Sequence, residues 1–178
     1  GQYDTNKDIF WASGACFFVR SHIFHQLNGF DEGYFAHQEE IDFCWRIQHT
    51  GHRIRYVADS IVYHVGGATL SNSSPKKSYL NFRNSLFTLV KNVPQKKLFG
   101  SIFLRMCLDL IAVIKFIFEL KPWHAWAVLK AHISFYKHLS YYLSKRKEHI
   151  NKKEDYFHSM SIVWKYFIAR KTRFDQLD

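Results

Sequence analysis

The chain has 178 residues, of which 47% are hydrophobic and 18% aromatic, and this composition excludes a disordered chain. Its net charge of +10 favours an anionic partner, such as nucleic acid, an anionic membrane or a phosphorylated sugar donor. The three cysteines, Cys16, Cys44 and Cys107, are widely spaced and contain no CxxC pair, which favours a reducing compartment and buried thiols over a disulfide framework.

The first predicted element is a buried strand at residues 9–20, where small and bulky apolar side chains alternate. Within it, Ser13 and Gly14 allow the backbone to approach a neighbouring group closely, either a ligand or another strand at a bulge. Ser21 is expected to cap a short helix at residues 23–27 that ends at Asn28-Gly29.

Three carboxylates crowd into four positions of the next segment, at Glu39, Glu40 and Asp42. Like charges this close repel one another, so the cluster indicates either a site that uses them or the favourable positive end of a helix. The apolar spacing predicts that helix over residues 39–49, ended by Gly51 in a left-handed conformation.

Short connecting elements flank this acidic helix. A turn is predicted before it, at Asp31 and Gly33. Two short strands are predicted after it, at residues 53–57 and 61–65. The polar stretch 71–77 indicates a surface loop, with a lid over phosphates as the alternative.

From residue 78 onward the apolar period becomes helical, and we expect helices at residues 79–91, 98–120, 122–144 and 156–174. The charges of helix 98–120 lie within about 120° of arc, which leaves a wide apolar face. This face indicates either a helix that lies on a membrane surface or one that is buried against the rest of the protein or in a dimer. Aromatic and basic residues are mixed in the third helix, which suits a lipid headgroup layer.

Taken in order, these motifs resemble the second half of a family 2 glycosyltransferase domain with the GT-A fold, of the bacterial rhamnosyltransferase type. The resemblance rests on the segment 12–20, Phe30-Asp31-Glu32, the run from Glu39 to Arg46, Gly51 and His64, and on Tyr79, Arg83-Asn84 and Lys91 further along. It implies an α/β fold at residues 1–78, with a short mixed sheet and helices. A mainly α-helical, basic and aromatic region would follow at residues 79–178.

The resemblance also implies an inverting transfer of a sugar from a nucleotide-sugar donor to an acceptor hydroxyl, in the synthesis of surface polysaccharide or glycolipid. It assigns the general base to Glu40, where the family usually has Asp, with Glu39 and Asp42 as the alternatives. Asp31 would lie near the acceptor or simply cap its turn. The substrate-binding residues implied are Ser13, Gly14, Asp31 and Arg83.

A divalent cation, Mn²⁺ or Mg²⁺, is implied as well, because it would neutralise the diphosphate leaving group. His64 matches a metal-ligand position, with a hydrogen-bonded histidine at a strand end as the alternative. Most metal ligands belong to the family's first half, which contains a nucleotide-binding βαβ unit and an Asp-x-Asp motif, and this chain has no Asp-x-Asp. We therefore expect the C-terminal portion of a larger enzyme, inactive alone, cytoplasmic or peripheral on the cytoplasmic membrane face, with no nucleic-acid partner.

Two alternatives rest on other features of the sequence. A non-catalytic helical module that binds anionic membrane or nucleic acid would explain the charge and residues 98–174, but it leaves the acidic cluster without a purpose. A zinc site would use His37, His49, His52 and Cys44, which lack a standard ligand spacing.

Overall fold

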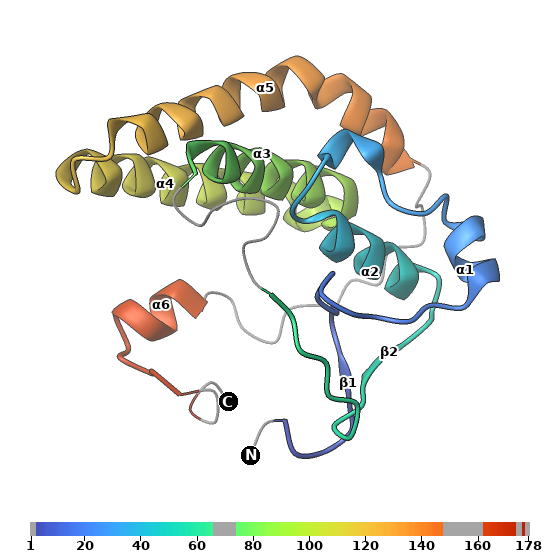
Figure 1. The fold of residues 1–178 in the computed structure, drawn as a ribbon. Coiled ribbons are helices and arrows are strands. Elements are labelled where there is room, and N and C mark those ends of the chain that lie inside the picture. Colours follow the sequence, from blue (N-terminus) through green and yellow to red (C-terminus); the bar gives the residue numbers. More distant parts are fainter. Residues whose placement is uncertain (1–2, 66–73, 148–161, 174–175, 177–178) are drawn as a thin grey trace.

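The computed structural model describes residues 3–65, 74–147, 162–173 and 176, which form a small N-terminal part and a layer of long helices (Figure 1). The N-terminal part contains β1 (Lys7–Ile9), α1 (Ser21–Gln26), the 3-10 helix η1 (Glu32–Tyr34), α2 (Glu39–His49) and β2 (Ile54–Tyr56). The layer contains α3 (Pro75–Asn92), α4 (Gln95–Phe118) and α5 (Pro122–Lys147), and the short α6 (Ile162–Phe167) comes last. The chain is thus mainly helical with a small sheet, which agrees with a partial α/β domain followed by helices. The predicted division between residues 78 and 79 falls inside α3 and stays a prediction.

The two strands form a narrow antiparallel ribbon, in which Lys7 lies opposite Tyr56 and Ile9 opposite Ile54. The second strand confirms the prediction at residues 53–57. No strand forms at residues 61–65, all of which are exposed, so that prediction was wrong.

The prediction of a buried strand over residues 9–20 was also wrong, because strand pairing stops at Ile9. The chain beyond it is tied to α2 instead: the Gln48 side chain donates to the Phe10 carbonyl at 2.7 Å, and the Ala12 amide lies 3.5 Å from the Cys44 sulfur. Apolar side chains of this segment pack onto α1 and α2. A strand needs a neighbouring edge, and this segment has none in the described part of the chain.

Helix α2 has the predicted bounds, and Gly51 after it has the predicted left-handed backbone, with φ at 83°. Its apolar face, with Phe43 and Ile47, packs against α1. Helix α1 begins at Ser21, with Arg20 as its N-cap residue, so the prediction that Ser21 caps this helix was wrong.

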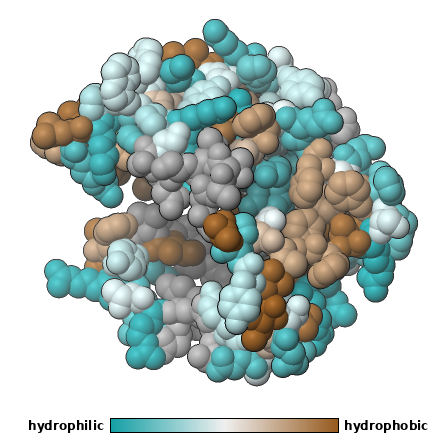
Figure 2. Space-filling model, in the orientation of Figure 1, coloured by the Kyte–Doolittle hydropathy of each residue, from teal (hydrophilic) through white to brown (hydrophobic). Residues whose placement is uncertain are grey.

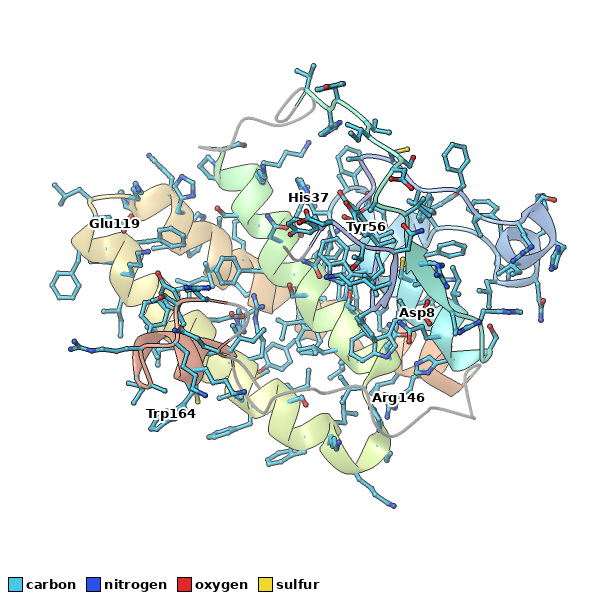
Figure 3. The ribbon with its side chains drawn as sticks, turned by 90° about the horizontal axis from the view of Figure 1, so that it is seen from below. Asp8, His37, Tyr56, Glu119, Arg146 and Trp164 are labelled. Carbon is cyan, nitrogen blue, oxygen red and sulfur yellow. The ribbon has the colours of Figure 1, made fainter. Side chains whose placement is uncertain are left out.

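Helices α4 and α5 lie close to their predicted ranges, but α3 begins earlier than predicted. Pro75 occupies its first turn, where the missing backbone N–H is not needed, so residues 75–77 are helical and not part of a loop. Residues 71–73 lie outside the described residues, as do 156–161 and 174 of the predicted helix 156–174. Within the described part of that prediction, α6 (Ile162–Phe167) is helical, whereas residues 168–173 are not, so the predicted helix is too long at its C-terminal end. At the far end of α5, Arg146 donates to the Val90 carbonyl at 2.7 Å, which ties α5 to the end of α3 (Figure 3).

No helix of the described ranges is long and apolar enough to cross a membrane. The helical layer nevertheless exposes apolar side chains, and Figure 2 shows some of them at the end where α4 meets α5. Of the three cysteines, Cys44 is buried as predicted, whereas Cys16 and Cys107 are exposed, contrary to that prediction.

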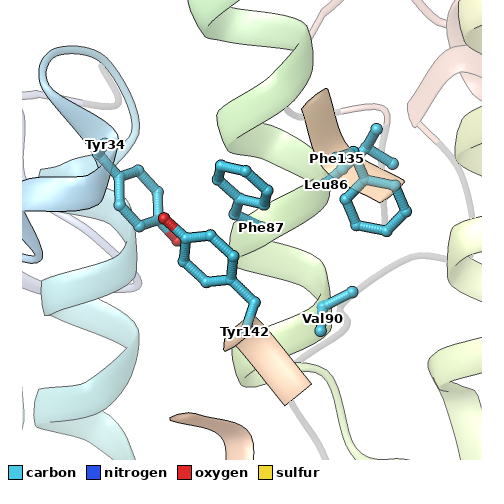
Figure 4. Close-up of a cluster of buried hydrophobic side chains, with 6 residues drawn as sticks. All are labelled: Tyr34, Leu86, Phe87, Val90, Phe135 and Tyr142. Carbon is cyan, nitrogen blue, oxygen red and sulfur yellow. The ribbon is translucent and has the colours of Figure 1, made fainter. Parts of the chain in front are cut away.

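One buried aromatic cluster joins the two parts of the fold (Figure 4). Tyr34 enters it from η1, and its hydroxyl hydrogen-bonds to Thr88 of α3 at 3.1 Å. Phe87 of α3 and Tyr142 of α5 stack with ring centroids 3.8 Å apart. The cluster therefore fixes the turn before α2 against α3 and α5.

Gly33 gives a test of this junction. A Cβ on Gly33 would lie 2.5 Å from the Tyr142 hydroxyl, so we expect Gly33→Ala to lower the free energy of unfolding by about 1–3 kcal/mol, measured by urea denaturation. Gly100 is the matched control, because nothing lies within 4 Å of a Cβ there. Gly100→Ala should stabilise helix α4 by up to about 1 kcal/mol, and equal effects of the two changes would contradict the packing described.

Candidate functional site

Asp42, in the first turn of α2, is the centre of a buried network of charges. It has no exposed surface, and its carboxylate accepts hydrogen bonds from Arg46 (2.9 Å), Lys91 (2.9 Å) and Asn92 (2.8 Å). Arg46 also donates to two backbone carbonyls of the segment between α1 and η1. Burial raises the pKa of Asp42, but the attraction of Lys91 and Arg46 outweighs it and holds the pKa below its ordinary value. The network keeps Asp42 ionised and fastens α2 to α3.

Asp31 extends the network toward α5. Its carboxylate lies 2.8 Å from Lys91 and 2.9 Å from Lys145, and its side chain is 5% exposed. Burial raises the pKa of Asp31, but the two lysines outweigh it and lower the pKa to about 2. The other oxygen accepts a hydrogen bond from the Gly33 amide at 3.1 Å, so Asp31 caps the predicted turn. A contact between Asp31 and a substrate stays a prediction.

The two depressed aspartate pKa values predict a loss of stability in acid. A carboxylate whose pKa is lower in the folded protein stabilises it above the unfolded pKa near 4, and this contribution is lost as the pH falls toward 2. For Asp31 alone the loss is roughly 2 kcal/mol. Urea midpoints measured at pH 6, 4 and 2.5 should fall steeply below pH 4. Lys145→Met should make the fall smaller, because without this lysine the folded pKa of Asp31 is closer to the unfolded value. A midpoint of the wild type that stays constant down to pH 2.5 would contradict the network.

Three polar atoms at the start of α2 are buried and have no hydrogen-bond partner among the described residues: His37 Nε2, Glu39 Oε2 and Glu40 Oε2. Buried polar groups are nearly always paired in folded proteins, so this cluster can accept a partner that the fold itself does not supply. Burial raises the pKa of Glu39, and the neighbouring Glu40 carboxylate adds to the rise.

The loop before α2 is held in an unusual conformation. Phe35, His37 and Gln38 all have left-handed backbone, with φ of 65°, 68° and 74°. Each such residue costs on the order of 1 kcal/mol and persists only where other contacts impose it. Asn84 of α3 imposes it here, because its side-chain amide donates to three carbonyls of residues 34–37 at 2.7–3.0 Å. His37 accordingly lies beside α3 (Figure 3).

Arg83 supports the same turn from α3. Its guanidinium donates to Asn84 Oδ1 (2.9 Å), to the Gly33 and Tyr34 carbonyls (3.2 and 3.0 Å) and to the Tyr79 hydroxyl (3.4 Å). These contacts use all three nitrogens of the side chain and account for Arg83 as a positioning residue. A contact between Arg83 and a substrate stays a prediction.

A broad cleft of about 1190 Å³ lies between the β1–β2 ribbon and the segments before α1 and after β2. Ser13, Cys44 and His64 are among its lining residues, whereas Glu40 is not. Glu40 lies beside Gly14, where a Cβ would lie 3.8 Å from the Glu40 Cδ atom. This is an ordinary van der Waals distance, so a side chain at residue 14 would fit there, and the close approach of the Gly14 backbone to a ligand stays a prediction. Gly14 itself is not a lining residue, but both of its neighbours in the sequence are.

The described residues contain no group of three or more His, Cys, Asp or Glu side chains that could hold a metal ion. His64 is exposed, and the residues described here do not fit a complete divalent-cation site. His64 as a ligand, and Mn²⁺ or Mg²⁺ as the ion, stay predictions. The zinc alternative is not supported, because its four side chains do not form such a group.

Two curated enzymes resemble part of this chain, and both are named as rhamnosyltransferases. Rhamnosyltransferase WbbL of Escherichia coli (strain K12) is 45% identical to this chain over 54 residues, which are 30% of the chain and 20% of WbbL. The N-acetylglucosaminyl-diphospho-decaprenol L-rhamnosyltransferase of Mycobacterium tuberculosis is 37% identical over 60 residues, which are 34% of the chain and 20% of that protein.

Over this stretch the chain is rhamnosyltransferase-like. The chain spans about a fifth of the length of these relatives. No family model matches it, and no solved structure matches it significantly.

The rhamnosyltransferase-like chain contains two site features that the sequence interpretation missed. His37 was considered only as a zinc ligand, although it lies close to the acidic residues in the sequence. Asn84 was recognised as part of a motif, but its hold on the His37 carbonyl depends on a contact across 47 residues of sequence. Only His37 had a local signal, namely a titratable side chain two positions before Glu39.

Proposed function

We propose that this chain forms the acceptor side of an inverting rhamnosyl transfer site in which Glu40 is the general base. One observation carries the proposal: the buried Oε2 atom of Glu40 has no partner among the described residues, and the carbon atoms of the same side chain lie next to Gly14, whose neighbour Ser13 lines the cleft. The named activity of the similar proteins supports sugar transfer as the chemistry.

In the proposed reaction the acceptor hydroxyl gives its proton to Glu40 while its oxygen attacks the anomeric carbon of the donor sugar. The bond between that carbon and the nucleoside diphosphate breaks on the opposite face, and the diphosphate leaves with the bonding electrons. One bond forms as one breaks, so the configuration at the anomeric carbon is inverted. Glu40 has the required role because a carboxylate within hydrogen-bond reach of the hydroxyl can take up its proton.

Glu39 and His37 complete the proposed pocket. The raised pKa of Glu39 makes its carboxylate a stronger base than an ordinary one, so Glu39 is the second candidate for the proton acceptor. The unpaired His37 nitrogen is available to hydrogen-bond a sugar hydroxyl. Asp42 is less suited to the role, since both its oxygens already accept hydrogen bonds from buried side chains.

The substrates of this proposal are a nucleoside diphosphate rhamnose and a sugar hydroxyl on a lipid-linked acceptor, such as N-acetylglucosamine on a polyprenyl diphosphate. The name of the mycobacterial relative describes an acceptor of this kind. Ser13 and Gly14 would line the substrate-binding site, and a divalent cation would be held mainly by groups outside this chain. Because the chain lacks an Asp-x-Asp motif, we expect little turnover without an added nucleotide-binding region. The reaction would take place in the cytoplasm or at the cytoplasmic face of the membrane.

A product assay tests the proposal. The chain and the full-length product of its gene are each incubated with nucleoside diphosphate rhamnose and prenyl-diphosphate N-acetylglucosamine, with Mn²⁺ or Mg²⁺ present. Mass spectrometry should detect an acceptor that is heavier by one deoxyhexose with the full-length product and little or none with the chain alone. An unmodified acceptor in every reaction, with donor and acceptor both intact, would contradict the proposed function.

A further inference from the structure

Helix α4 turns one ion pair, Arg105 with Asp109, toward the protein and exposes many large apolar side chains, whereas the inward face of an ordinary surface helix is apolar. Its one buried residue is Asp109, whose carboxylate lies 2.6 Å from Arg105 and 2.9 Å from His132 of α5. The large apolar side chains that α4 exposes, each by 46% or more, are Phe99, Phe103, Leu104, Leu110, Ile111, Ile114, Ile117 and Phe118. At 100° per residue these side chains occupy an arc of about 140° around the helix. No charged residue between Phe99 and Phe118 in the sequence falls within that arc.

The apolar stripe of α4 adjoins a second one on α5. Trp126, Leu129, Ile133 and Tyr136 are each about half exposed and fall within about 80° of arc on α5. The Tyr136 hydroxyl lies 3.5 Å from the Met106 sulfur of α4, which brings the two stripes together. The turn between the helices exposes three large apolar side chains as well, with Phe118 83%, Leu120 88% and Trp123 72% exposed.

The α4–α5 hairpin carries an excess of positive charge, although Arg105 and Lys145 are paired with buried aspartates. Residues 95–147 contain ten Lys and Arg but only two acidic residues, Asp109 and Glu119. Asp109 is buried in its ion pair, and Glu119 lies 2.7 Å from Lys121. A second copy of this surface would bring two positive faces together, whereas an anionic bilayer supplies both an apolar layer and the complementary charge.

We propose that the α4–α5 hairpin docks on the surface of an anionic lipid bilayer. Helix α4 lies in the interface with its apolar stripe toward the acyl chains, and the tip with Leu120 and Trp123 enters deepest. The flanking lysines contact the lipid headgroups. This docking does not require sugar transfer, although it would bring the chain to the layer that holds a polyprenyl-linked acceptor.

Vesicle flotation tests the docking independently of any enzymatic activity. The chain should float with vesicles of phosphatidylglycerol and phosphatidylcholine at low salt, and less with phosphatidylcholine alone or at high salt. The triple variant Leu110→Gln, Ile114→Gln, Ile117→Gln should lower the partition coefficient about ten-fold or more. The control triple Ile61→Gln, Val62→Gln, Val65→Gln removes aliphatic side chains of similar exposure away from the hairpin and should float like the wild type.

A second measurement decides the case if the triple variant does not fold, as checked by circular dichroism. Lipids with brominated acyl chains should quench the tryptophan fluorescence of the bound wild-type chain, and Trp123→Phe with Trp126→Phe should remove most of this quenching. Unchanged quenching in that variant would overturn the proposal. The proposal would also be overturned if the wild-type chain did not float with the vesicles and sedimentation showed that it forms a dimer through the same apolar residues.

Discussion

Replacing Glu40 with glutamine is expected to lower the rate of rhamnosyl transfer by about 10²–10⁴-fold, because the amide cannot accept the proton of the attacking hydroxyl. The substitution keeps the shape of the side chain and its contact with Gly14, so the KM for the acceptor should change little. The measurement is steady-state kinetics of product formation with the full-length gene product.

The controls for this experiment are two further glutamate-to-glutamine changes. Glu32 is exposed in the turn before α2, so Glu32→Gln should leave the rate near that of the wild type. Glu39→Gln should lower the rate less than Glu40→Gln, since Glu39 serves in the proposal as a neighbour and not as the base. A fully active E40Q protein beside an inactive E39Q protein would contradict the assignment.

Replacing Asp42 with alanine is expected to lower the free energy of unfolding by about 3–5 kcal/mol, because it leaves buried cations without their partner. In this variant Arg46, which is 4% exposed, would keep only backbone carbonyls as hydrogen-bond partners. Of the two carboxylates that now accept hydrogen bonds from Lys91, only that of Asp31 would remain. Urea denaturation followed by circular dichroism measures the change.

The matched control is the exposed ion pair between Asp8 and Arg53, whose side chains are 45% and 78% exposed and 3.3 Å apart. Asp8→Ala removes the same charge from the same kind of pair in contact with water, so it should cost less than about 1 kcal/mol. If the two aspartate changes cost the same, the buried network does not have the stabilising role described here.

Local signals were enough to predict the elements that hold the candidate site. The period of apolar residues and Gly51 gave the bounds of α2, and Asp31 with Gly33 gave the turn before it. These features depend on residues a few positions apart, whose interactions are fixed by helix and turn geometry.

The features that the sequence did not predict depend on contacts between distant residues. The apolar run 9–20 looked like a strand, but a strand forms only where another edge is available to pair with it, and Gln48 and Cys44 hold this segment instead. Lys91 joins Asp31 across 60 residues of sequence and Asp42 across 49, which no local pattern reveals. The left-handed backbone at His37 is likewise imposed by Asn84 from another helix.

The most direct test of the account is an NMR titration of the isotope-labelled chain with prenyl-diphosphate N-acetylglucosamine. If the start of α2 is the acceptor side of a transfer site, the backbone amides of Glu39 and Glu40 and the ring nitrogens of His37 should shift with the added ligand, together with Ser13 and Gly14. Shifts confined to α4 and α5, with the signals of the acidic residues unchanged, would contradict it and indicate a chain that binds only the lipid part of the molecule.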